Sequence, residues 1–198
     1  EQYGFGFECV SQAELDYLFA LFPRLEPTRV LFTPSFAPRS EYAAALARDV
    51  WVTVDSTYPL QEWPELFKGR QIVLRVDPGY GLGHHEKVRT GDRQAKFGLA
   101  ADALPEMLAA VRAAGARNGV LHAHVGSGIT DVTHWPQVYA QLAELAEQIG
   151  GVSAIDVGGG LGIAYLDGDQ PPQVEEYVDV KVRGIERVFD PVPRIAIQ

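Results

Sequence analysis

Apolar, strand-like segments alternate with helix-like segments along the whole chain, and this alternation most limits the possible folds. Residues of strand-forming type and apolar character predict seven strands, at 5–10, 29–33, 50–54, 71–76, 119–125, 153–157 and 194–197. Helical periodicity lies between them, and is clearest over residues 135–149. Mostly apolar strands joined by helices indicate a parallel sheet that is covered by helices.

Two α/β architectures satisfy this alternation, an open doubly wound sheet and a (β/α)8 TIM-like barrel. Seven short strands, evenly separated by helices, fit a barrel lacking one strand better than an open sheet of seven. The chain has 198 residues, of which 46% are hydrophobic, which is enough for one domain with a sizeable core. We therefore predict that residues 1–198 form one partial (β/α)8 barrel domain.

Charge and cysteine content limit the kinds of partner. The net charge of -9 argues against nucleic acid or an anionic membrane as the main partner. The single cysteine, Cys9, excludes an intrachain disulfide framework, and no run of residues is long and apolar enough to read as a membrane span. We expect a cytoplasmic protein that acts on a small molecule.

Three consecutive glycines, Gly158, Gly159 and Gly160, follow the sixth predicted strand. Without Cβ atoms, the backbone can adopt positive φ and present its N–H groups to a ligand at close range. Such a group of N–H dipoles suits a phosphate, although a plain tight turn could use the same residues. In these barrels, phosphate sites often follow strands seven and eight. The glycines fit that place if one barrel strand lies upstream.

Other polar residues fall near the carboxyl ends of predicted strands, which form the working face of such barrels. Glu8 ends the first strand and Arg75 lies near the end of the fourth, where either could instead be a structural charge. His122 and His124 are two residues apart, so they share one side of the fifth strand. We interpret His122 as a hydrogen-bonded core residue and His124 as functional, while Ser127 could bind a ligand or only cap the turn.

Six motifs in order resemble the barrel domain of the pyridoxal-phosphate-dependent ornithine/diaminopimelate/arginine decarboxylases, which have the alanine-racemase-like fold. They are GFECVS (6–11), LRVDPG (74–79), HHEKVRTG (84–91), AKFGL (95–99), HAHVGSG (122–128) and DVGGG (156–160). Each motif is weak alone, but together they are specific and span nearly the whole chain. Within the family they are most similar to the diaminopimelate-specific members, including those fused to an aspartokinase.

The resemblance implies pyridoxal 5'-phosphate as cofactor and decarboxylation of an amino acid, meso-diaminopimelate to L-lysine, by a homodimeric parent protein. It implies that His124 stacks on the cofactor ring and that Ser127 and the glycines at 158, 159 and 160 hold the phosphate. It also implies that Glu8 acts beside the cofactor and that Arg75 supports the same network.

Parts of the family's site have no match in the sequence. The family's cofactor-binding lysine precedes the Gly-Phe-Glu motif, and the chain's lysines do not match its context; they are Lys68, Lys87, Lys96 and Lys181. Gln198 stands where the family has a glutamate that pairs with the ring nitrogen, and the family's C-terminal β domain has no counterpart. Without an amine nucleophile, we expect these 198 residues alone to be inactive.

Two other functions fit some of the residues. His122 and His124 form a His-x-His pair of the kind that zinc hydrolases use on barrels. Few other histidines accompany the pair, and a hydrolase would leave the three glycines without a role, so we expect no metal. The second alternative is a barrel module that binds phosphate without catalysis.

Overall fold

A computed structural model describes residues 5–79 and 97–196. The strands, in chain order, are β1 (Phe7–Cys9), β2 (Val30–Phe32), β3 (Trp51–Val54), β4 (Gln71–Asp77), β5 (Leu99–Ala100), β6 (Arg117–His122), β7 (Ala154–Asp156) and β8 (Arg194–Ala196). The α-helices are α1 (Gln12–Leu21), α2 (Arg39–Ala47), α3 (Tyr58–Glu62), α4 (Pro64–Phe67), α5 (Leu104–Ala113), α6 (Trp135–Ile149) and α7 (Val174–Val188). Short 3₁₀ helices cover Pro27–Arg29 and Ala101–Ala103. None of the helices in these ranges has the length and apolar character needed to cross a membrane.

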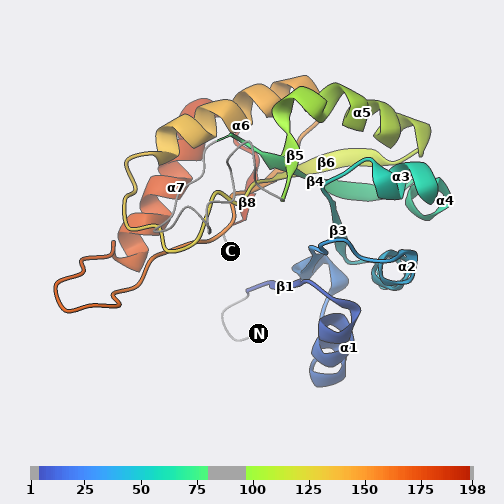
Figure 1. Cartoon of the computed structure of the whole chain (residues 1–198), viewed down its shortest axis with the longest axis horizontal. Helices are drawn as coiled ribbons and strands as arrows, with labels where there is room; N and C mark the ends of the chain where they lie inside the picture. The colour runs from blue at the N-terminus through green and yellow to red at the C-terminus, as the bar shows by residue number, and fades with distance from the viewer. Residues whose placement is uncertain (1–4, 80–96, 197–198) are drawn as a thin grey trace. The chain divides into compact units, whose positions relative to one another are not determined.

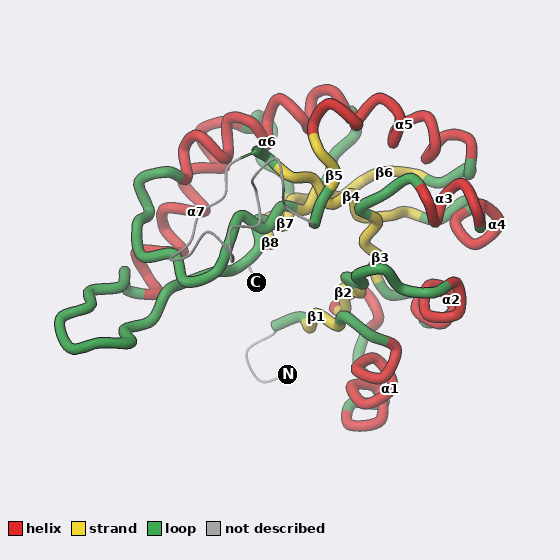
Figure 2. The backbone as a smooth tube through the Cα atoms, in the orientation of Figure 1, coloured by secondary structure: helices red, strands yellow, loops and turns green. Residues whose placement is uncertain are grey.

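Strands that follow one another in the chain pair in parallel, within each of two compact units (Figure 2). In the first unit, β1, β2, β3 and the beginning of β4 pair in that order. In the second unit, β6, β7 and β8 pair in that order, and β5 pairs with the end of β4. A doubly wound sheet would reverse its strand order at a switch point, and the described strands of neither unit do so. The predicted partial (β/α)8 barrel topology is confirmed.

The helices and strands agree with the sequence prediction except at a few boundaries. Two short helices, α3 and α4, lie between β3 and β4, because Pro64 fits the first turn of a helix but not its interior. β5 was not predicted. The strand predicted over 119–125 is β6, which ends at His122, so His124 follows the strand instead of lying within it. The motif 84–91, Lys96 and Gln198 lie outside the described residues, so the interpretations that depend on them stay predictions.

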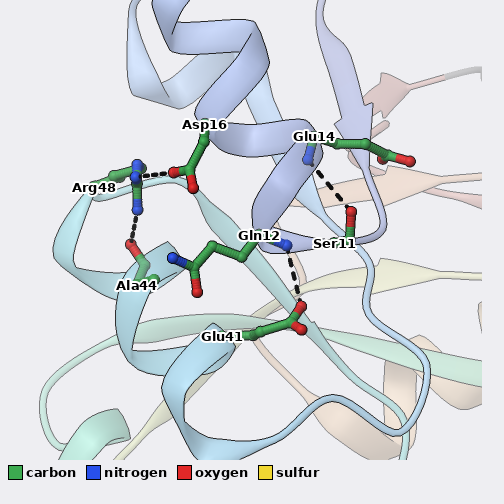
Figure 3. Close-up of polar contacts among 7 residues, drawn as sticks. All are labelled: Ser11, Gln12, Glu14, Asp16, Glu41, Ala44 and Arg48. Carbon is green, nitrogen blue, oxygen red and sulfur yellow. Dashed lines mark hydrogen bonds and ion pairs between the residues drawn. The ribbon is translucent and has the colours of Figure 1, made fainter.

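Polar contacts fix the first two helices of the first unit (Figure 3). Ser11 caps α1, because its hydroxyl oxygen accepts a hydrogen bond of 3.3 Å from the Glu14 N–H. The Glu41 carboxylate of α2 accepts a bond of 3.1 Å from the first backbone N–H of α1. Arg48, after α2, forms an ion pair with Asp16 of α1. The last two contacts join the first half of α1 to the beginning and the end of α2.

Three buried aromatic residues join α6 to α7 in the second unit, where the two helices lie side by side (Figure 1). The rings of Trp135 and Tyr139 stack with centroids 5.6 Å apart, and the Tyr177 ring meets the Trp135 ring edge-on at 6.1 Å. Gly184 of α7 faces Tyr139 so closely that a Cβ atom there would lie 2.3 Å from two ring carbons. The missing side chain at Gly184 therefore lets the two helices approach.

We expect the substitution Gly184→Ala to destabilise the chain. Alanine favours the helix by about 1 kcal/mol over glycine, but its methyl group would overlap the Tyr139 ring, and overpacking of this kind costs about 1–3 kcal/mol. Denaturant unfolding followed by circular dichroism should show a lower midpoint. Glu186→Ala, at an exposed position of the same helix, is the control and should leave the midpoint nearly unchanged. A midpoint raised by Gly184→Ala would contradict the packing argument.

Candidate phosphate and cofactor site

The glycine turn after β7 requires glycine at two of its positions. The angle φ is +64° at Gly158 and +103° at Gly160, a region that side chains disfavour. A Cβ atom at Gly158 would lie 2.8 Å from Nδ1 of His124, and one at Gly160 would lie 2.1 Å from the carbonyl oxygen of Gly126. Backbone conformation and lack of space therefore both exclude larger residues here.

The segment that follows β6 runs beside this turn, as a continuation of the parallel pairing between β6 and β7. The Ala123 N–H donates to the Asp156 carbonyl at 2.9 Å, and the Ile129 N–H donates to the Gly160 carbonyl at 2.7 Å. Ile129 also forms a parallel bridge with Leu161. The turn and the residues between 123 and 129 are thus held together at both ends, with the partly exposed His124 in between.

The amide groups of the turn differ in whether the described part of the chain supplies an acceptor for them. The Gly158 N–H donates to the buried Asp156 carboxylate at 2.9 Å, so it is already used. For the N–H groups of Gly159 and Gly160, no acceptor is found among the residues that the structure describes. Of these three amides, those of Gly159 and Gly160 are therefore the candidate donors to an anion.

The carbonyl side of the same turn is bound by α7. The ammonium nitrogen of the fully buried Lys181 donates to the carbonyls of Val157, Gly158 and Gly159 at 3.3, 2.7 and 3.4 Å. The Tyr177 hydroxyl donates to the Gly159 carbonyl at 2.5 Å. The same nitrogen lies 4.3 Å from the centroid of the Trp135 ring and 4.5 Å from that of the Tyr177 ring.

Sequence reasoning missed Lys181 and Tyr177, although α7 contains a signal for them. Tyr177, Lys181 and Ile185 are spaced by four residues and are all buried, so they share one face of the helix. A lysine on such a face needs a partner, because a buried charge is stable only when it is paired or hydrogen-bonded. The spacing could have identified Lys181 as bound to something inside the protein.

Both histidines near the turn are neutral at neutral pH. Burial and the positive charge of Arg75 lower the pKa of His124 to about 4, with Asp156 acting in the opposite direction. The same two causes lower the pKa of His122 to about 3. The predicted burial of His122 is confirmed, since it is 1% exposed. The predicted hydrogen bond to it is not found, because neither ring nitrogen has a partner among the described residues.

The second compact unit contains all the predicted site residues except Glu8. Arg75 lies in β4 with its guanidinium carbon 5.0 Å from the centroid of the Phe97 ring, and its charge acts on both histidines. Ser127 is exposed in the segment that pairs with the turn. Glu8 is an exposed residue of β1 in the first unit. In the described ranges, no group of three or more histidine, cysteine or acidic residues could hold a metal ion, so the hydrolase alternative gains no support.

The lowered pKa of His124 predicts a loss of stability on mild acidification. The unfolded histidine takes up a proton below about pH 6.5, whereas the folded one does so only near pH 4. The unfolded state therefore binds more protons in this window, and between pH 7 and pH 5 this residue should remove about 2 kcal/mol of unfolding free energy. Denaturant unfolding at both pH values measures the effect. His124→Asn should lose less stability than the unaltered chain over the same range, and an equal loss in both would contradict the assignment.

Comparison with known proteins identifies relatives of the chain. It is 36% identical over 166 residues to the diaminopimelate decarboxylase of Deinococcus radiodurans, covering 83% of this chain and 42% of that protein. It is 32% identical over 191 residues to that of Methanothermobacter thermautotrophicus, covering 93% of this chain and 44% of that protein. A crystal structure of a diaminopimelate decarboxylase superposes with a TM-score of 0.87 at 25% identity, over 99% of this chain and 48% of that one.

The chain thus spans somewhat less than half the length of these relatives. The family model described as "Pyridoxal-dependent decarboxylase, pyridoxal binding domain" matches residues 1–198. The match extends over both compact units, and so over every residue of the site described above. The chain belongs to the pyridoxal-binding domain family of the pyridoxal-dependent decarboxylases, and its fold is the partial (β/α)8 barrel of that family.

Proposed function

We propose that this chain is the cofactor-binding barrel of a decarboxylase that converts meso-diaminopimelate to L-lysine. The observation that carries the proposal is the glycine turn. Its Gly159 and Gly160 amides have no acceptor among the described residues, and its Gly158 lies against the neutral imidazole of His124. The family accounts for the cofactor, pyridoxal phosphate. The choice of diaminopimelate among amino-acid substrates rests on the relatives that match most of the chain.

The residues at the turn fit the phosphate group of this cofactor. Two amide donors without an acceptor among the described residues suit phosphate oxygens, and the exposed Ser127 hydroxyl is a third candidate donor. Because Gly158 has no Cβ atom, the His124 imidazole can lie against the turn, with its Nδ1 only 2.8 Å from where that atom would be. Binding through backbone amides also explains how a chain with a net charge of -9 can hold an anion.

The cofactor supplies the decarboxylation chemistry when it is bound, because its ring accepts the electrons released at the amino acid's α-carbon. The protein residues supply position and electrostatics. A neutral His124 can lie against an aromatic ring without adding a charge to it. Arg75 provides a positive charge to the same surroundings. The role of Glu8, which the resemblance to the family implies, stays a prediction. The homodimer and the aspartokinase fusion stay predictions.

Replacing His124 should weaken cofactor binding. Aromatic stacking contributes roughly 0.5–1.5 kcal/mol beyond buried area, so we expect His124→Ala to raise the Kd for pyridoxal phosphate by about threefold to tenfold. Titration followed by cofactor absorbance measures the Kd. His134→Ala, at a half-exposed histidine of the loop before α6, is the matched control and should bind normally. An unchanged Kd in His124→Ala would remove this residue from the site.

The substrate assignment has a separate test. The whole protein that carries this chain should release carbon dioxide from meso-diaminopimelate and not from L-ornithine or L-arginine, measured with pyridoxal phosphate present. Product analysis should identify L-lysine. A preference for ornithine or arginine would contradict the assignment to diaminopimelate while leaving the family unaffected.

A further inference from the structure

We propose that Lys181, together with Tyr177, is a positioning residue that fixes the carbonyl side of the glycine turn and so orients the Gly159 and Gly160 amides toward phosphate. This inference rests on the proposed function, because it concerns the phosphate of the same cofactor. Neither α7 residue needs to touch the cofactor. Both act through the backbone of the turn.

The covalent geometry of the peptide bond connects the two sides of the turn. The Gly158 carbonyl and the Gly159 N–H belong to one peptide plane, and the Gly159 carbonyl and the Gly160 N–H belong to the next. In a trans peptide these two groups point in opposite directions. The only cis bond among the described residues precedes Pro191, so both planes are trans. Holding the two carbonyl oxygens on the α7 side therefore turns the two N–H groups away from α7.

The contacts from α7 match this requirement. Lys181 donates to both of these carbonyls, most closely to that of Gly158 at 2.7 Å, and Tyr177 adds a second donor to that of Gly159 at 2.5 Å. An ammonium group has three donors, and it meets three carbonyls here. The Asp156 carboxylate takes the Gly158 N–H, which fixes the preceding plane as well. The peptide planes that join residues 157 to 158, 158 to 159 and 159 to 160 are thus each held by at least one hydrogen bond from the protein.

A turn of three glycines depends on such supporting hydrogen bonds more than other turns do. Glycine has the widest choice of backbone conformations, so an unsupported Gly-Gly-Gly segment would lose much entropy on binding a ligand. Contacts that hold the turn before the ligand arrives remove this cost from binding. The positive charge behind the carbonyls also favours peptide dipoles whose N–H ends face an anion.

Lys181 is placed for this role and not for a role as nucleophile. It is fully buried, and its amine lies among three carbonyls and between two aromatic rings. Burial lowers its pKa to about 7, while Asp156 acts to raise it. The carbonyls and the faces of the Trp135 and Tyr177 rings favour the charged form. In either protonation state, the amine can donate to the Gly158 carbonyl.

The test compares pyridoxal phosphate with pyridoxal, which lacks the phosphate. The measured quantity is the ratio of the two dissociation constants, in the unaltered chain and in Lys181→Met. Methionine has a similar length and no donor, so the ratio should fall by about tenfold, the effect of losing roughly 1.5 kcal/mol of hydrogen bonding. Lys68→Met, at an exposed lysine of the first unit, is the matched control and should keep the ratio.

The outcomes separate the two proposals. If the unaltered chain binds both compounds equally, the glycine turn does not bind phosphate and the proposed function fails. If the unaltered chain prefers the phosphate form and a folded Lys181→Met keeps the full preference, the positioning role is wrong while the proposed function stands. A general loss of packing would weaken both compounds alike and leave the ratio unchanged, so it would also count against the positioning role.

A second variant applies if Lys181→Met does not fold. Tyr177→Phe keeps the ring beside the Lys181 amine and removes only the hydroxyl that donates to the Gly159 carbonyl. It should lower the preference for pyridoxal phosphate by about threefold, which corresponds to one weak hydrogen bond. An unchanged preference in a folded Tyr177→Phe would overturn the proposed action from α7.

Discussion

The close approach of two backbone segments, 157–162 and 123–129, is the constraint on which the site depends. The Gly160 Cβ position lies 2.1 Å from the Gly126 carbonyl oxygen, so the two segments can meet only where one of them has no side chain. Their hydrogen bonds extend the β6–β7 pairing beyond the strand ends. The same approach brings the His124 imidazole against Gly158. Glycine is therefore required in this turn for the close approach of the two segments as well as for its positive φ angles.

Burying a lysine behind this turn is a consequence of how the turn is built. The carbonyls of Val157, Gly158 and Gly159 would otherwise face the apolar contact between α6 and α7, where unsatisfied acceptors are costly. A charged amine also loses its hydration there, which is the reason its pKa falls. The cost of unsatisfied carbonyls and the cost of a dehydrated amine offset each other, because the amine donates to these carbonyls. The Trp135 and Tyr177 rings also contact the amine.

The long helices and the site's main parts could be predicted from the sequence, while strand ends and partners across elements could not. α6 has the predicted bounds because its apolar period is regular and Gly150 stops it. β6 ends at His122, three residues before the predicted end, and Gly126 and Gly128 with their positive φ follow only after that end. Periodicity alone puts Lys181 on the buried face of α7. Its partners lie more than twenty residues away on another element, so only the folded chain shows them.

The proposed anion site at this turn is compatible with the acidic character of the chain. No lysine or arginine needs to reach the ligand, because the donors are amides whose orientation is fixed from behind. Burial, together with the positive charges of Arg75 and Lys181, lowers the pKa of His124 and keeps its imidazole neutral. A protonated imidazole would compete with the amides for the anion and would no longer present an uncharged face to a ring. Burial therefore keeps the His124 imidazole uncharged, while three backbone carbonyls accept hydrogen bonds from the buried Lys181 amine.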